Sequence, residues 1–270
     1  MPLSASTLLI ADLHLDASRP DISRAAFDTF AAATRFDALW ILGDLFEAWI
    51  GDDAGLADPL GERVAAALAA LAGTGTRVHL MLGNRDFLLG EAFAHAAGAT
   101  LHREDELIVT LAGSPVLLLH GDTLCTDDAD YQRLRRQLRD PAWQAGFTAL
   151  PVAERLEAAR QLRQASREAG GHKAHAIMDV TPATVHARLL AAGTDHGATT
   201  MVHGHTHRPA VHDVALPSLP GHTVDRSGGS TARRLVLGDW HADGGQGIVV
   251  DADGLTPVRC PDGIRPPFRG

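Results

Sequence analysis

Apolar runs of strand length alternate with amphipathic stretches along the first half of the chain. The runs lie at residues 7–11, 38–42 and 78–82. Stretches with the apolar spacing of a helix follow them at residues 21–33, 56–72 and 90–97. Strands that alternate with helices are typical of α/β proteins, so we predict an α/β fold.

The second half begins with a predicted hairpin, formed by apolar runs at 107–111 and 115–119. A helix is predicted at 181–192. Further strands are predicted at residues 199–202, 235–237, 247–250 and 256–258. Because the chain shows no internal repeat and its 270 residues can build one large core, we expect a single domain over residues 1–260. Residues 261–270 contain three prolines and two glycines, and we expect a poorly ordered tail there.

Strand-length runs in this chain repeatedly end at a glycine beside a side chain that can bind a metal. The pairs are Gly43-Asp44, Gly83-Asn84, His120-Gly121 and Gly204-His205, and the first run ends at Asp12-Leu13-His14. Ligands bind at the carboxyl ends of strands in open α/β sheets, and glycine lets the backbone turn sharply there. A single Asp or His after a strand is usually an ordinary loop residue. The repetition of the pattern indicates one shared metal site.

The segment His203–Pro209 places three histidines on alternate residues, and imidazole is the commonest metal ligand near neutral pH. The complete set of candidate ligands is Asp12, His14, Asp44, Asn84, His120, His205 and His207. Seven ligands are too many for one tetrahedral zinc and suit two divalent ions that share a carboxylate. Such a two-metal site predicts hydrolysis of a phosphate ester or anhydride. His203 is interpreted as an orienter of a ligand.

Residues 126–178 form a long, mostly helical insertion with an unusual charge. The insertion has nine basic and seven acidic residues, whereas the rest of the chain has 15 basic and 26 acidic residues. Apolar side chains recur at helical spacing in two stripes, at Tyr131, Leu134 and Leu138 and at Leu156, Ala159 and Leu162. A solvated helical hairpin would explain the pattern. The other interpretation is an amphipathic cap over the site, which suits a substrate with an apolar end and phosphates, or a membrane surface.

Charge and cysteine content limit the compartment and the partners. The net charge of −9 disfavours a general polyanion-binding protein, so we expect no nucleic acid partner. Two cysteines, Cys125 and Cys260, provide no disulfide framework and fit a reducing compartment. The beginning of the chain has no basic region typical of a signal peptide, and no apolar run approaches the ~20 residues that span a bilayer. We therefore expect a cytoplasmic monomer whose membrane contacts are peripheral.

The motifs match, in order, those of the calcineurin-like metallophosphoesterases. Most members have Gly-Asn-His-Asp or Gly-Asn-His-Glu in the third motif, and this chain has Arg85 in place of that histidine. Longer runs, at residues 41–53, 83–90, 120–125 and 176–180, closely resemble one family of this superfamily, the UDP-2,3-diacylglucosamine hydrolases of lipid A synthesis. The similarity extends from about residue 8 to residue 250.

The resemblance implies a sandwich of two mixed β-sheets flanked by helices, with a helical cap insertion at about 126–178. It implies hydrolysis of UDP-2,3-diacylglucosamine to UMP and 2,3-diacylglucosamine 1-phosphate (lipid X), with Mn²⁺ as the usual metal, on the cytoplasmic face of the inner membrane. One ion would bind Asp12, His14, Asp44 and His207. The other would bind Asp44, Asn84, His120 and His205.

Asn84 and Arg85 follow a ligand-bearing strand and are expected to act on the phosphate oxygens. Arg85 is a fixed cation, suited to stabilising charge rather than to protonating a leaving group. The matching positions imply substrate contacts from Asp128, Tyr131, Arg163, Ser166, Lys173 and His205, with the acyl chains along the apolar stripes. Gly170 stands where relatives often have Asn, so one polar contact is missing or replaced.

Two other functions are consistent with parts of the pattern. A nucleotide phosphodiesterase or nuclease would use the same metal site, but it would need an open basic groove with stacking aromatic side chains. A non-catalytic scaffold on the same fold would be expected to have lost ligands, and this chain retains all seven.

Overall fold

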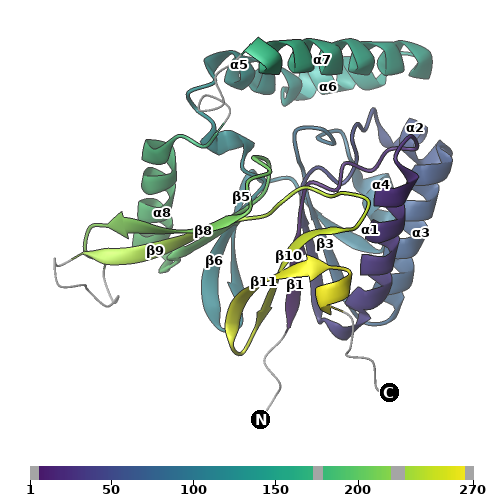
Figure 1. Cartoon of the computed structure of the whole chain (residues 1–270). Helices are drawn as coiled ribbons and strands as arrows, with labels where there is room; N and C mark the ends of the chain where they lie inside the picture. Colours follow the sequence, from purple (N-terminus) through teal and green to yellow (C-terminus); the bar gives the residue numbers. More distant parts are fainter. Residues whose placement is uncertain (1–5, 173–178, 220–228, 265–270) are drawn as a thin grey trace.

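The computed structural model describes residues 6–172, 179–219 and 229–264, and the side chains of 165–172 lie outside this description. The strands form two mixed sheets, with helices on their outer sides (Figure 1). The first sheet has the order β11-β10-β1-β2-β3-β4 and the second has the order β5-β6-β7-β9-β8. The predicted α/β sandwich of two mixed sheets is confirmed.

The first sheet is mostly parallel. Its parallel strands are β1 (Thr7–Ile10), β2 (Ala38–Leu42), β3 (Arg77–Met81) and β4 (Ala99–His102). The antiparallel pair β10 (Gly245–Asp251) and β11 (Gly254–Cys260) extends it beyond β1. The flanking helices are α1 (Pro20–Ala32), α2 (Asp52–Ala57), α3 (Pro59–Gly73) and α4 (Glu91–Ala96), with the 3-10 turn η1 (Ala33–Arg35) after α1.

The second sheet starts with the predicted hairpin, β5 (Glu106–Leu111) and β6 (Ser114–Leu119), which pair in antiparallel register as expected. Strands β7 (Thr200–His203) and β9 (Ser230–Val236) run parallel to β6, and β8 (Ala210–Leu216) closes the edge. Helix α8 (Pro182–His196) packs on the outer face.

Alternate side chains of each strand enter different cores, as the two-residue period of a strand requires. On β1, Leu9 packs between the two sheets, while Leu8 and Ile10 pack against the helices. On β6, Leu118 enters the core between the sheets and Leu117 packs against α8. The strands are therefore buried on both faces, which explains why they read as continuous apolar runs.

Three details differ from the expectations. The predicted helix at 56–72 is two helices, because Asp58 caps the backbone N–H groups of Leu60 and Gly61 and Pro59 starts α3. Strands β4 and β8 were not expected. Both are edge strands whose partly exposed residues break the apolar run that marks a buried strand.

Part of the expected tail is ordered. Asp262–Ile264 forms the 3-10 turn η3, because the Ile264 side chain is buried in the core and its carbonyl accepts a hydrogen bond from Arg35. Residues 265–270 lie outside the described residues.

The insertion after β6 begins with the 3-10 turn η2 (Asp122–Leu124) and continues as α5 (Ala129–Leu138), α6 (Pro141–Thr148) and α7 (Val152–His172). These helices lie across one end of the sandwich, at the top of Figure 1. We call α5, α6 and α7 the cap. In the described parts of the chain, no helix is both long and apolar enough to span a bilayer.

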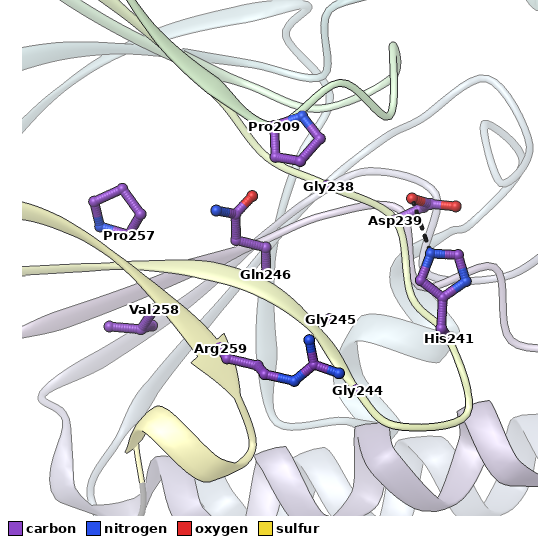
Figure 2. A pocket seen from close by; sticks show the side chains of 10 residues that line it. All are labelled: Pro209, Gly238, Asp239, His241, Gly244, Gly245, Gln246, Pro257, Val258 and Arg259. Carbon is purple, nitrogen blue, oxygen red and sulfur yellow. Dashed lines mark ion pairs between the residues drawn. The ribbon is translucent and has the colours of Figure 1, made fainter.

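A cavity of about 400 Å³ lies beside β10 and β11, and Asp239 and His241 line it together with Gln246 and Arg259 (Figure 2). Among the residues described, its lining includes none of the predicted metal ligands.

Candidate metal centre

The predicted ligands follow the carboxyl ends of parallel strands in both sheets. Asp12 and His14 follow β1, Asp44 follows β2 and Asn84 follows β3, whereas His120 follows β6 and His205 and His207 follow β7. Backbone hydrogen bonds join these loops: the N–H of His14 donates to Asp44 O at 2.9 Å, and the N–H of Gly204 donates to His120 O at 2.8 Å. Residues up to 193 positions apart therefore meet at one point, as the distances between them show.

Most candidate ligands have an unusual backbone conformation. The φ angles are 56° at Asp12, 48° at His14, 53° at Asp44, 69° at His205 and 55° at His207. Left-handed φ values are uncommon for residues other than glycine and cluster at functional sites, where surrounding structure holds them. The recurrence at five candidate ligands indicates that β1, β2 and β7 end in sharp turns that present these side chains to the shared point.

Two glycines of the motifs make room for the carboxylates. A Cβ atom on Gly83 would lie 2.1 Å from Asp44 Oδ1, and one on Gly204 would lie 2.3 Å from Asp12 Oδ2. These contacts are far shorter than any van der Waals separation, so larger residues would displace the carboxylates.

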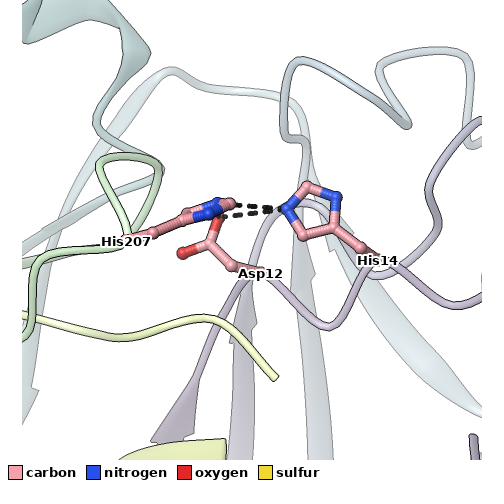
Figure 3. A group of neighbouring side chains, drawn as sticks. All are labelled: Asp12, His14 and His207. Atoms are coloured by element: carbon pink, nitrogen blue, oxygen red, sulfur yellow. Dashed lines mark hydrogen bonds and ion pairs between the residues drawn. The ribbon is translucent and has the colours of Figure 1, made fainter. Parts of the chain in front are cut away.

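One group of ligands consists of Asp12, His14 and His207 (Figure 3). The Nε2 atoms of the two imidazoles face each other at 3.1 Å. Asp12 Oδ1 lies 3.5 Å from His207 Nε2 and 4.0 Å from His14 Nε2.

Asp44 connects this group to a second one around His120. Its Oδ2 atom lies 3.7 Å from both His14 Nε2 and His120 Nε2. Asn84 Oδ1 lies 3.0 Å from His120 Nε2 and 2.9 Å from His205 Nδ1. The position of Asp44 between the groups is the one expected of a bridging carboxylate.

The chemistry of this donor set fits divalent metal ions. Asp12 and Asp44 are 0% and 2% exposed, and two buried carboxylates near one another need positive charge. Burial alone would lower the pKa of His14, but the carboxylates of Glu47, Asp44 and Asp12 raise it above its usual value. In contrast, burial and the charge of His120 lower the pKa of His205 to about 4, so this imidazole is neutral and able to donate a lone pair.

Two motif carboxylates to which the sequence assigned no role organise the loops. Asp86 accepts backbone N–H groups from Gly83 at 2.8 Å and Leu45 at 2.7 Å. Burial and the nearby charge of Asp44 raise the pKa of Asp86 to about 6. Asp122 accepts the Tyr131 hydroxyl at 2.8 Å, which joins the cap to the loop of His120. Their places in the Gly-Asn-Arg-Asp and His-Gly-Asp motifs were the available signal.

His203 lies outside the ligand groups. Its Nδ1 faces Gly204 O at 2.8 Å, its Nε2 lies 3.1 Å from an Arg234 nitrogen, and it is fully buried. Burial lowers its pKa to about 3, with the charge of Arg234 acting in the same direction. It supports the turn that carries His205.

The predicted substrate contacts fall into different environments. Arg85 and Arg163 line one cavity beneath the cap together with Tyr131. Asp128 caps α5 by accepting the backbone N–H of Tyr131 at 3.0 Å. The Ser166 side chain and Lys173 lie outside what the structure describes, and Gly170 lies within α7.

Comparisons with known proteins agree with this geometry. Residues 5–209 match the model of the calcineurin-like phosphoesterase family. The chain is 49% identical to a UDP-2,3-diacylglucosamine hydrolase of Chromohalobacter salexigens, over 94% of this chain and 96% of the relative. It is also 49% identical to the Azotobacter vinelandii protein of the same name, over 93% and 98% of the two chains, and 48% identical to that of Pseudomonas paraeruginosa, over 95% and 99%. The chain therefore belongs to the calcineurin-like phosphoesterases and, within them, to the family of these hydrolases.

Proposed function

We propose that this protein hydrolyses the pyrophosphate bond of UDP-2,3-diacylglucosamine, releasing UMP and 2,3-diacylglucosamine 1-phosphate for lipid A synthesis. The observation that carries the proposal is a cavity that connects the metal centre to an apolar surface under the cap. The names of the relatives point to the same substrate.

The cavity beneath the cap has a volume of about 110 Å³ and two kinds of wall. Asn84 and Arg85 form its end at the metal centre. The remaining wall is mostly apolar and comes from the core and the cap, with Trp49, Phe87, Leu88, Leu134, Leu138, Trp143, Phe147 and Leu162. A ligand that is charged at one end and carries acyl chains matches this division, because burying its apolar part is worth ~0.8 kcal/mol per CH₂.

Two arginines at the cavity are available for phosphate oxygens. Arg163 Nε is buried, and no described group accepts a hydrogen bond from it. The Arg85 backbone is held by its N–H, which donates to Asp44 Oδ1 at 2.8 Å, and its side chain lines the cavity. Guanidinium groups with free donors bind phosphate oxygens well, so we assign Arg85 and Arg163 to the pyrophosphate.

For the reaction, we assign one divalent ion to Asp12, His14, Asp44 and His207 and the other to Asp44, Asn84, His120 and His205, with Mn²⁺ as the metal. When bound, such a pair of ions supplies Lewis acidity that activates water and polarises the phosphoryl group. Arg85 stabilises the charge that develops on the phosphoryl oxygens. The leaving sugar phosphate is a weak base and needs little protonation, which fits an arginine where most of the superfamily has histidine.

We further propose that the cap contacts the inner membrane from its cytoplasmic side. Leu150, Val152 and Leu156 are 40%, 42% and 41% exposed around the beginning of α7. Leu156 and Val152 also line a second cavity of about 490 Å³ next to the first. Exposed apolar side chains on the element that covers the substrate cavity would ease transfer of a lipid from the bilayer.

The test is hydrolysis of UDP-2,3-diacylglucosamine by metal-stripped protein with and without Mn²⁺, beside the generic diester bis-p-nitrophenyl phosphate. We expect Mn²⁺-dependent release of UMP well above turnover of the generic diester. Rapid hydrolysis of the diester without hydrolysis of the lipid nucleotide would support the metal site but contradict the proposed substrate. A phosphodiesterase or nuclease would then be the better assignment.

A further inference from the structure

The histidines of the metal centre differ in what lies behind them. His120 has its Nδ1 against a neutral backbone carbonyl, Leu42 O, at 2.9 Å. His14 and His207 instead have carboxylates behind their rings. His14 Nδ1 lies 3.1 Å from Glu47 Oε2, at ion-pair distance but outside hydrogen-bond angles, and His207 Nδ1 lies 3.7 Å from Asp239 Oδ2. Both imidazoles belong to the group formed by Asp12, His14 and His207.

Glu47 is held in place from several directions. Its backbone N–H donates to Leu15 O at 3.1 Å, next to the bridge between Leu15 and Phe46 that pairs the two ligand loops. Arg19 lies 3.6 Å from Glu47 Oε2 and also donates to His14 O. Glu47 is therefore fixed between a cation and a candidate ligand.

Asp239 is held less tightly and is more open to solvent. It follows β9, its side chain is 34% exposed, and its second oxygen lies 3.6 Å from Nε2 of His241, which lines the cavity of Figure 2 beside it. The separation of 3.7 Å from His207 is beyond hydrogen-bond range, so any support that it gives is weaker than that of Glu47.

We propose that Glu47, assisted by Asp239, is a positioning residue that selectively strengthens the ion held by Asp12, His14 and His207. This inference rests on the proposed two-metal function. A neutral imidazole can bind a metal through Nε2 only when its proton is on Nδ1, and a carboxylate behind Nδ1 stabilises that tautomer and orients the ring. The carboxylates of Glu47 and Asp239 behind the two rings also make the Nε2 lone pairs of His14 and His207 more basic.

The asymmetry predicts two ions of unequal affinity. The ion at His14 and His207 has charged carboxylates behind two of its ligands, whereas the His120 imidazole rests on a neutral carbonyl. Loss of an outer partner of this kind typically weakens metal binding 10–100-fold. The ion-pair contacts described for Glu47 are with His14 and Arg19, and none is with His120 or His205. Its removal should therefore affect one ion only.

The test is a Mn²⁺ titration of metal-stripped wild type and Glu47→Gln, following the electron paramagnetic resonance signal of free Mn²⁺. We expect one of the two ions to bind about 10-fold or more weakly and the other to keep its affinity. Glu91→Gln is the matched control, since Glu91 is 75% exposed and pairs with Arg103 on the surface.

Equal weakening of both ions, or unchanged affinity for both, would overturn the inference. Should Glu47→Gln fail to fold, Asp239→Asn provides the same selective readout with a smaller effect, and no selective loss there would also overturn it. If wild type binds two ions of unequal affinity but releases no UMP, the proposed function fails while the role of Glu47 in metal binding can still be measured.

Discussion

The sandwich and the cap are stabilised in different ways, although both contribute to one site. In the sandwich, α1 and α3 each bury apolar side chains against the first sheet, including Phe30 and Leu68 at 1% and 0% exposure. In the cap, α5 has no buried residue. The connection between the cap and the sandwich is largely polar.

Three cap arginines make that connection, and two of them, Arg135 and Arg139, reach loops that carry candidate ligands. Arg135 Nε donates to Asp122 Oδ2 at 2.7 Å, and Arg139 donates to Gly83 O at 2.9 Å. Arg155 is 2% exposed and donates to Ile50 O at 2.7 Å and Asp53 Oδ1 at 2.8 Å.

The sandwich and the cap therefore differ in how tightly they are held. Close packing holds the left-handed turns of the metal centre in place, because a packed core has few alternative arrangements. The cap is held by a small number of hydrogen bonds to charged groups, each worth about 1.5–3 kcal/mol. The attachment of the cap to the sandwich therefore depends on few contacts.

The largest effect is expected inside the sandwich, from Asp44→Asn. Because Asp44 lies 3.7 Å from histidines of both groups, hydrolysis at excess Mn²⁺ should fall on the order of 10³-fold, beyond the 10–100-fold loss typical of outer partners. In the presence of a chelator, the melting temperature of the variant should equal or exceed that of wild type. The substitution removes the Asp44 charge, which repels the Asp86 carboxylate and raises its pKa. Activity within about 10-fold of wild type would contradict the bridging role.

At the boundary of the two regions, Arg85→His should lower kcat on the lipid substrate about 100-fold, the usual cost of losing a donor to a developing charge. Hydrolysis of the generic diester should change less, because it has a different leaving group. Steady-state kinetics on both substrates measure the effect. Full activity of the variant on the lipid would refute the explanation given for this arginine.

In the cap, Arg155→Met should raise KM for the lipid about 10-fold, or about 1.4 kcal/mol, and leave turnover of the generic diester nearly unchanged. The physical reason is that the buried guanidinium fixes the beginning of α7 to Ile50 and Asp53, neither of which is a candidate ligand. Arg160→Met is the control, since Arg160 is 64% exposed and pairs only with Glu157 among the described residues. An equal loss on both substrates would show that the cap is coupled to the metal centre.

The smallest effect concerns His79 and His102, which both stack on Trp40. Their ring centroids lie 4.2 Å and 4.8 Å from that of Trp40. Burial, followed by the charges of His102 and Arg77, lowers the pKa of His79 from 6.5 to about 4. The unfolded chain therefore takes up the proton first, and stability present above about pH 6.5 decreases as the pH falls toward 4.

His79→Gln should flatten this dependence, so that the fall in melting temperature between about pH 7 and pH 5 is smaller by roughly 2 °C than in wild type. Thermal unfolding followed by circular dichroism at the two pH values measures it. His95→Gln, at an exposed position of α4, should leave the slope unchanged. Parallel slopes for wild type and His79→Gln would rule out a contribution from this pair.

Local patterns in the sequence predicted much of the fold and the members of the site. Apolar runs that are buried on both faces, such as β2 and β6, stand out in the sequence. Edge strands β4 and β8 do not, because their partners supply the context that their composition lacks. The candidate ligands were predictable because glycine and metal-binding residues recur at strand ends, and their binding of metal stays a prediction.

The sequence by itself determined which side chains could meet, through strand period, motif spacing and the steric need for Gly83 and Gly204. Only the tertiary structure decided which nitrogen of each histidine faces the centre and which carboxylate stands behind it. Glu47 lies in the run 41–53 but was assigned no role there, Asp239 lies in none of the runs, and the two reach His14 and His207 through space. The physical reason is that periodicity encodes burial along one element, whereas orientation and electrostatic support arise between elements that the chain joins only on folding.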